Sequence, residues 1–179
     1  MFVYNQLGIR VVEPTDLQEI RQMRNDPSTW IFLTDVRLIT SAMQERWYTK
    51  IAEANDTKYF VVFDENHPFI GLVRCDEIDQ VNRSIRIGCD VVPTLRGIGY
   101  GGRIYDLMLK YCFHYLNMHR VWLLVLENNE IAIRLYLRKG FREEGRLREA
   151  IFRNGRYWDY IVMSIIDHEY ERQTTESVL

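Results

Sequence analysis

The sequence predicts an α/β (α+β) protein with a mixed β-sheet, and three observations support this class. Strand patterns suited to hairpins come first, a strand–helix–strand–helix unit follows in the middle, and a second hairpin closes the chain. The middle unit predicts parallel pairing at the sheet centre, whereas hairpins pair antiparallel. The chain has 179 residues, of which 47% are hydrophobic. That length and composition fit one domain with a sizeable core.

The first half is expected to contain two helices and four strands. Pro14-Thr15-Asp16 begins the first helix, and Ser41 with Gln44 three positions later indicates a capping box at the second. The apolar loop between them, residues 26–40, either covers a substrate pocket or packs on the domain core. The expected elements are strands at residues 9–12, 59–63, 69–77 and 84–92 and helices at residues 14–25 and from residue 41.

The second half contains the central unit and the closing hairpin. Residues 120–126 form a nearly continuous apolar run, typical of a strand covered on both faces. Gly140 is placed to take the positive φ that often follows a helix, and Asn154-Gly155 is the strongest turn signal in the chain. The helix at 101–117 should bury a stripe made of Ile104, Met108, Cys112 and Tyr115. The expected elements are helices at residues 101–117 and 129–139 and strands at residues 120–126, 141–152 and 157–166.

The ends of the chain carry two further expectations. A single domain is predicted over residues 1–170, with a polar tail at residues 171–179, and the polar segment from His168 onward is expected to fray. The chain start lacks a basic segment followed by an apolar run, and no stretch reaches the roughly 18 apolar residues of a membrane helix. A cytoplasmic protein with no membrane partner is therefore expected.

Charge and cysteine usage exclude several classes of function. The formal net charge is −2, from 25 acidic and 23 basic residues, so no broad positive field favours nucleic acid as a partner. Most of the basic residues are arginines, which suit forked contacts to phosphate or carboxylate groups. Cys75, Cys89 and Cys112 have no metal-ligand spacing and are interpreted as reduced, mostly buried thiols. The four histidines are scattered, so no metal site is expected.

The segment from Val91 to Gly102 is the most informative part of the chain. It joins an apolar strand to an amphipathic helix through a turn with four glycines in six positions. Glycines allow positive φ and close approach of the backbone to a ligand, and the first amides of a helix point at whatever lies beyond its N-terminus. The turn therefore predicts an anionic ligand, most simply a phosphorylated cofactor. The alternative is a glycine-rich turn that only reverses the chain.

Two motifs resemble the GNAT superfamily of acetyl-CoA-dependent N-acetyltransferases. They are Arg96-x-x-Gly99-x-Gly101 and Asn129-x-x-Ala132-x-x-x-Tyr136-x-x-x-Gly140-Phe141. The resemblance covers about residues 8–170, and the run Leu116-Asn117-Met118-His119-Arg120 and the closing hairpin look most like the branch with spermidine and ribosomal-protein acetyltransferases. It implies one domain with a mixed sheet of about seven strands, about four flanking helices, and acetyl-CoA as the cofactor.

The same resemblance assigns cofactor contacts. The backbone of Val91 and Val92 would pair with the pantetheine arm, with Asn129 on its opposite side, and Tyr136 would stand near the thioester sulfur as general acid. An alternative for Tyr136 is an aromatic side chain packed in the core. The main-chain amides that would hold the pyrophosphate are those of Arg96, Gly97, Ile98, Gly99, Tyr100, Gly101 and Gly102.

Catalysis also needs a neutral acceptor amine, so a base or a water chain must remove a proton from it. Asp90, at a strand end, and Glu127, before Asn128, are the candidate bases. Each is equally interpretable as a solvated or hydrogen-bonded carboxylate, and the family often uses water in this role.

The acceptor is less constrained by the sequence. Spermidine acetyltransferases have an acidic cluster between their first two helices, but residues 30–37 here are mainly apolar, which disfavours a polyamine. The region looks more like the branch that acetylates amino groups of nucleotide-linked sugars, where aromatic rings stack on a base or sugar. A peptide N-terminus or another small primary amine is the alternative. The candidate acceptor-binding residues are Arg24, Asn25, Trp30 and Phe32.

An N-acetyltransferase in which the amine attacks bound acetyl-CoA directly, in a ternary complex, is thus the leading prediction. A catalytically silent acyl-CoA-binding regulatory module is the alternative. A dinucleotide oxidoreductase is disfavoured because no acidic ribose ligand follows the glycines at about 20 residues. Exposed aromatic loops would either close over the substrate or form a homodimer.

Overall fold

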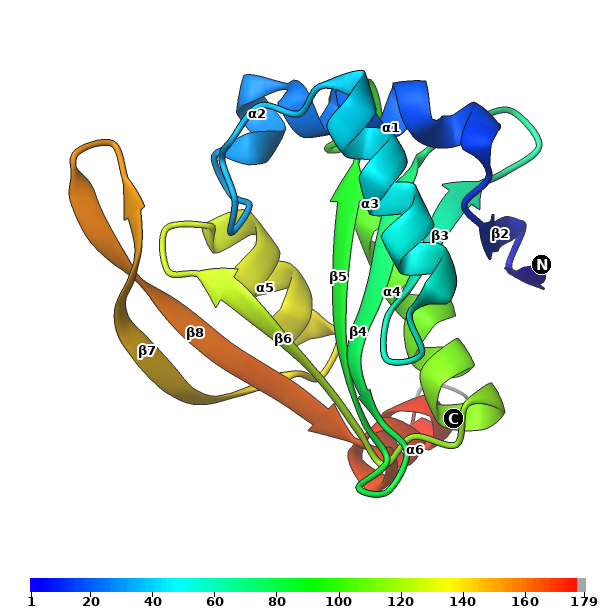
Figure 1. The fold of residues 1–179 in the computed structure, drawn as a ribbon. Coiled ribbons are helices and arrows are strands. Elements are labelled where there is room, and N and C mark those ends of the chain that lie inside the picture. Colours follow the sequence, from blue (N-terminus) through cyan, green and yellow to red (C-terminus); the bar gives the residue numbers. More distant parts are fainter. Residues whose placement is uncertain (177–179) are drawn as a thin grey trace.

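The computed structural model describes residues 1–176 and contains one eight-stranded mixed sheet with helices on both faces (Figure 1). The strands lie in the order β1-β2-β3-β4-β5-β6-β8-β7, and only β5 and β6 pair in parallel. The strands are β1 Phe2–Tyr4, β2 Leu7–Val11, β3 Lys58–Phe63, β4 Gly71–Asp79, β5 Ser84–Val91, β6 Arg120–Leu126, β7 Arg142–Arg153 and β8 Arg156–Ile166. The helices are α1 Leu17–Asn25, α2 Pro27–Trp30, α3 Ser41–Glu53, α4 Tyr100–Lys110, α5 Glu130–Arg138 and α6 Asp167–Glu176.

The predicted α/β class and the central parallel pair are confirmed. The sheet has one strand more than expected, because the chain start forms β1 and pairs with β2. Two helices are also additional: the four-residue α2 and the C-terminal α6. Within the described residues, no helix is long and apolar enough to span a membrane.

Alternation along β4 builds a separate core on each face of the sheet. Val73 and Cys75 point to the larger core, which α4 covers, whereas Leu72 points to a smaller core under α1 and α3. Ile104 and Met108 of α4 are almost fully buried in the larger core. These helices hold β5 between two packed layers, so its carboxyl end has a fixed position.

The parallel pair β5–β6 separates partway along its length. The strands are in register only from Ser84 to Arg86, opposite Arg120 to Trp122. Beyond this point β6 continues to pair with β8, and residues 87–91 of β5 have no partner on β6. Figure 1 shows the two strands diverging toward their carboxyl ends, below α2 and beside α5.

Three local expectations differ from the structure. The N-cap of α3 is Thr40, whose Oγ1 accepts from the Met43 amide at 3.2 Å, so the cap precedes the predicted Ser41. Tyr115 is 61% exposed, because the helix widens into a π-helical turn at Tyr111–Tyr115 and rotates that side chain out of the stripe.

The segment after His168 was expected to fray, but it continues as helix α6. The ring of Tyr170 stacks on Phe113 at a centroid distance of 4.9 Å, which anchors that helix to the π-helical turn after α4. Residues 177–179 of the predicted tail lie outside the described residues.

Candidate active site

A cavity of about 350 Å³ lies between the end of β5 and α5. Its walls come from the end of β5, the first turns of α4, one side of α5, and α2 with the loop that follows it. Of the predicted site residues, the cavity is lined by Phe32, Asp90, Val91, Arg96, Gly97, Gly101, Asn129 and Tyr136. It therefore joins segments that are up to about a hundred residues apart in the sequence.

The glycine-rich turn presents free amides at the mouth of this cavity. Gly97 and Gly99 have φ of 79° and 98°, values that residues other than glycine rarely adopt. The first helical bond of α4 runs from the Arg103 amide to the Gly99 carbonyl. Among residues 1–176, no acceptor is bonded to the amides of residues 97–102. Ile98, 67% exposed, leaves this face open to a ligand.

Arg96 differs from its neighbours in the turn. Its amide donates to the Pro93 carbonyl at 3.3 Å, so this amide is not available as predicted. Its side chain instead connects three segments. Nε donates to the Val91 carbonyl at 2.8 Å, Nη1 to the Ser28 carbonyl at 3.0 Å, and Nη2 to Thr29 Oγ1 at 2.5 Å. The guanidinium thus fastens α2 to the turn, a role the sequence analysis missed.

The β5 side of the expected cofactor site is only partly as predicted. Val91 lines the cavity, but the Val92 amide donates to the Ile70 carbonyl at 2.9 Å and Val92 lines a different hollow. Tyr100 is buried, and its hydroxyl donates to Asp64 Oδ2 at 2.6 Å. The side chain of Tyr100 therefore braces the turn, whereas its amide remains free.

Helix α5 forms the opposite wall. Asn129 caps the helix, with Oδ1 accepting from the Ala132 amide at 3.2 Å. Tyr136 lines the cavity, and its ring packs against Tyr105 and Phe141 at centroid distances of 4.9 and 5.9 Å. The ring of Tyr136 is thus part of the aromatic packing and also lines the cavity, and its role as general acid stays a prediction.

The ionisation of the cavity groups follows from their burial. Burial raises the pKa of Tyr136 to about 12, so its hydroxyl keeps its proton at neutral pH. Burial also raises the pKa of Asp90, and nearby arginines act in the opposite direction. Those arginines are Arg74, Arg24 and Arg96.

Glu127, the other candidate base, does not line the cavity. Its Oε1 accepts from the Asp159 amide at 3.1 Å, and its Oε2 lies 3.6 Å from Arg146 Nη1. Glu127 thus links the end of β6 to the closing hairpin, whereas Asp90 and Tyr136 both line the cavity.

The four candidate acceptor-binding residues are placed differently from one another. Phe32 lines the cavity and is 43% exposed. Asn25 fixes the main chain of Ile39 with both ends of its side-chain amide. Its Nδ2 donates to the Ile39 carbonyl at 2.9 Å, and its Oδ1 accepts from the Ile39 amide at 2.8 Å. Trp30 is half-buried outside the cavity wall. Nε of Arg24 is buried and has no hydrogen-bond partner within the described part of the chain.

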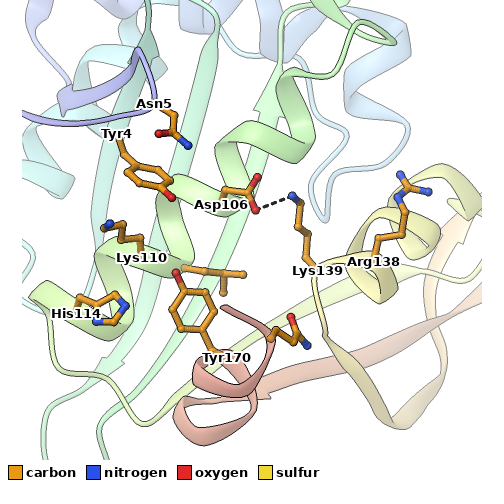
Figure 2. Close-up of a pocket in the computed structure, with 10 residues that line it drawn as sticks. Tyr4, Asn5, Asp106, Lys110, His114, Arg138, Lys139 and Tyr170 are labelled. Atoms are coloured by element: carbon orange, nitrogen blue, oxygen red, sulfur yellow. Dashed lines mark hydrogen bonds and ion pairs between the residues drawn. The ribbon is translucent and has the colours of Figure 1, made fainter. Parts of the chain in front are cut away.

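A second cavity, of about 510 Å³, lies between α4, the end of α5 and α6 (Figure 2). It shares no lining residue with the first. Figure 2 shows Lys139 reaching toward Asp106, with Nζ at 2.6 Å from Oδ1. Within residues 1–176, no cluster of three or more His, Cys, Asp or Glu side chains is arranged to hold a metal ion.

The chain is similar to known acetyltransferases along most of its length. A family model described as the acetyltransferase (GNAT) domain matches residues 6–142. A spermidine N(1)-acetyltransferase of Vibrio cholerae is 33% identical over 166 residues, covering 93% of this chain and 96% of that protein. A putative ribosomal N-acetyltransferase of Bacillus subtilis is 24% identical over 177 residues, covering 94% and 96%.

Solved structures are similar over the same length. The crystal structure of spermidine N-acetyltransferase from Vibrio cholerae in complex with CoA and spermine has a TM-score of 0.89 and 33% identity, covering 94% of this chain and 99% of that one. A dodecameric structure of the Vibrio cholerae enzyme has a TM-score of 0.82 and 33% identity, covering 95% and 99%. The chain therefore belongs to the acetyltransferase (GNAT) family and is an acetyl-CoA-dependent N-acetyltransferase.

Proposed function

We propose that the cavity between the end of β5 and α5 is the transfer site, where a primary amine attacks the acetyl group directly in a ternary complex. The observation that carries this proposal is the set of free amides at residues 97–102, opening onto a cavity that ends at Tyr136. Acetyl-CoA supplies the activated acetyl thioester. The free amides would hold its pyrophosphate, because helix N-termini favour anions.

Tyr136 and Asp90 are the groups placed to manage protons. Tyr136 would give its proton to the departing sulfur as the carbon–sulfur bond breaks, a contribution of the order of 10²- to 10⁴-fold. Asp90 is the candidate base for the attacking amine, because it lines the same cavity and Glu127 does not. The proton lost by the amine nitrogen balances the one taken up by sulfur.

The acceptor is proposed to carry an anionic group near its amine. Three arginines lower the pKa of Asp90 against the effect of burial. Two of them already have partners, because Arg96 bonds to α2 and Arg74 pairs with Asp76 at 2.8 Å. Nε of Arg24 has no hydrogen-bond partner among residues 1–176. A polycation would meet like charge here, whereas an amino-sugar nucleotide or the N-terminus of an acidic peptide would bring a partner for Arg24. Phe32 offers an exposed ring for stacking.

Two measurements test this function. Calorimetry with CoA and acetyl-CoA should give micromolar binding or tighter, and no binding to either would end the proposal. A thiol-release assay should then compare an amino-sugar nucleotide, an acidic peptide, a neutral amine and spermidine at equal concentration. We expect the anionic amines to give the highest kcat/KM, and a clear preference for spermidine would refute the assignment of the acceptor.

Self-association as a homodimer is proposed from the closing hairpin. The tip of the hairpin projects from the rest of the molecule (Figure 1). Its strands carry Leu147, Phe152 and Tyr157, which are 49, 54 and 60% exposed. Exposed apolar surface of this kind often marks an interface. Light scattering at micromolar concentration should report a dimer or a multiple of it, and a monomer throughout would contradict the proposal.

A further inference from the structure

Tyr105 is a buried phenol whose hydroxyl is not satisfied by the protein. The residue lies on α4 and is 3% exposed. Its Oη has no hydrogen-bond partner among residues 1–176. Most buried polar atoms are hydrogen-bonded, and an orphaned one in a native structure needs an explanation.

The position of Tyr105 supplies that explanation, because the residue also lines the candidate transfer cavity. Its ring packs on Tyr136 at 4.9 Å with an interplanar angle of 58°, and edge-on to Phe141 at 6.0 Å. The side chain is therefore held in place by aromatic packing. Its hydroxyl makes no hydrogen bond of ordinary length and angle within residues 1–176, although it lies close enough to Tyr136 to affect the pKa of that phenol. A phenylalanine would serve the packing equally well.

The two phenols affect each other in opposite directions. The Tyr105 hydroxyl lowers the pKa of Tyr136 against the larger effect of burial, because a donor beside a phenolate stabilises it. Tyr136 raises the pKa of Tyr105, which burial already holds well above its usual value. The other titratable groups that act on the pair are Cys89 and Asp90 from β5 and Arg74 from β4.

We propose that Tyr105 is a positioning residue that donates its hydroxyl proton in a hydrogen bond to Tyr136 Oη while Tyr136 protonates the departing sulfur. This inference rests on the proposed role of Tyr136 as the acid. The proton of Tyr136 moves to sulfur, and the negative charge left on Tyr136 Oη is stabilised by Tyr105, which keeps its own proton. Tyr136 recovers its proton from the one released by the amine.

The test is a double-mutant cycle of Tyr105→Phe and Tyr136→Phe, with Tyr111→Phe as the matched control. Tyr111 follows α4 directly, its ring packs on Phe2 and Phe60, and it does not line the cavity. Each variant loses only a hydroxyl, so the ring packing is retained. The readouts are kcat, KM for acetyl-CoA, and the thermal midpoint.

We expect Tyr105→Phe to lower kcat about tenfold, a modest share of what a general acid contributes. KM for acetyl-CoA should stay within about twofold, and the thermal midpoint should not fall, because an unpartnered hydroxyl is removed. In the Tyr136→Phe background, Tyr105→Phe should have no further effect on kcat, because Tyr105 acts only through Tyr136. Tyr111→Phe should match the parent enzyme.

Other outcomes overturn the inference separately from the proposed function. An unchanged kcat in Tyr105→Phe, or a decrease that persists in the Tyr136→Phe background, would refute the role of Tyr105 while leaving Tyr136 as the acid. A Tyr136→Phe enzyme with parental kcat would refute the acid itself, and the role of Tyr105 with it.

Discussion

Nε of Arg96 donates to the carbonyl oxygen of Val91, the last residue of β5, across a distance of 2.8 Å. Because the other nitrogens of the same guanidinium bond to Ser28 and Thr29, one side chain sets the spacing between the strand end and α2. The shape of the cavity mouth therefore depends on a forked side chain and not on charge alone.

Replacing Arg96 with lysine should weaken CoA binding. Lysine keeps the charge but has a single donor group, so it cannot reach both β5 and α2. The loss of about two hydrogen bonds corresponds to roughly a tenfold higher Kd by calorimetry. Arg134→Lys is the control, because within residues 1–176 the exposed Arg134 side chain pairs only with Glu130, one turn earlier on α5. Equal Kd values for the two variants would argue against this role of the Arg96 side chain.

Gly99→Ala should destabilise the protein and weaken cofactor binding together. Apart from its neighbours in the chain, no atom of the described residues lies within 4 Å of the position where a Cβ would be, so the cost comes from the φ of 98° alone. Placing a side chain in a left-handed conformation costs about 1–2 kcal/mol, which lowers the thermal midpoint by about 2–8 °C in a protein of this size. Gly145→Ala, equally uncrowded but outside the positive-φ region, should leave both measurements unchanged.

Asp90→Asn should become progressively more stable than the parent as pH rises. The raised pKa of Asp90 means that the folded state binds more protons than the unfolded state between the unfolded value, about 3.9, and the folded one. The parent therefore loses free energy of unfolding as pH rises through that window, and asparagine does not titrate. Urea unfolding at pH 4 and pH 7 measures the difference. A constant difference would show that burial does not perturb this carboxyl.

Arg24→Gln should affect acceptors according to their charge. The KM for an anionic amine should rise about tenfold, because a charge-assisted hydrogen bond is lost. The KM for a neutral amine of similar size should stay the same. Arg21→Gln, one turn earlier on α1, is the matched control. A rise in KM for both kinds of amine would show that Arg24 supports the structure of the site and does not recognise the charge of the acceptor.

Much of the fold follows from local signals. Asn154 and Gly155 both take positive φ at the hairpin tip, and Gly140 does so after α5, as their residue types predict. The glycine-rich turn was identifiable for the same reason, since positive φ is a property of single residues. The apolar run of β6 also indicated its central place.

The parts that could not be predicted depend on contacts between distant segments. Arg96 lies 68 residues from Ser28, and nothing local shows that its side chain would fasten α2. Asp90 and Glu127 both follow apolar strand residues, so only the tertiary structure separates the one in the cavity from the one paired with Arg146. Tyr105 lies at helical spacing among core residues. That it also lines the cavity depends on the divergence of β5 and β6, which the local sequence does not show.

The divergence of β5 and β6 determines how far the main chain of β5 is exposed to pairing with other chains. A strand that lacks a neighbour is ordinarily exposed to pairing with other chains, which promotes aggregation. Here residues 87–91 of β5 pair with β4 and lack a strand partner only on the opposite side, which faces the interior of the sheet between β4 and β6. The open side of this strand therefore lies inside the molecule, where other polypeptides cannot pair with its main-chain groups.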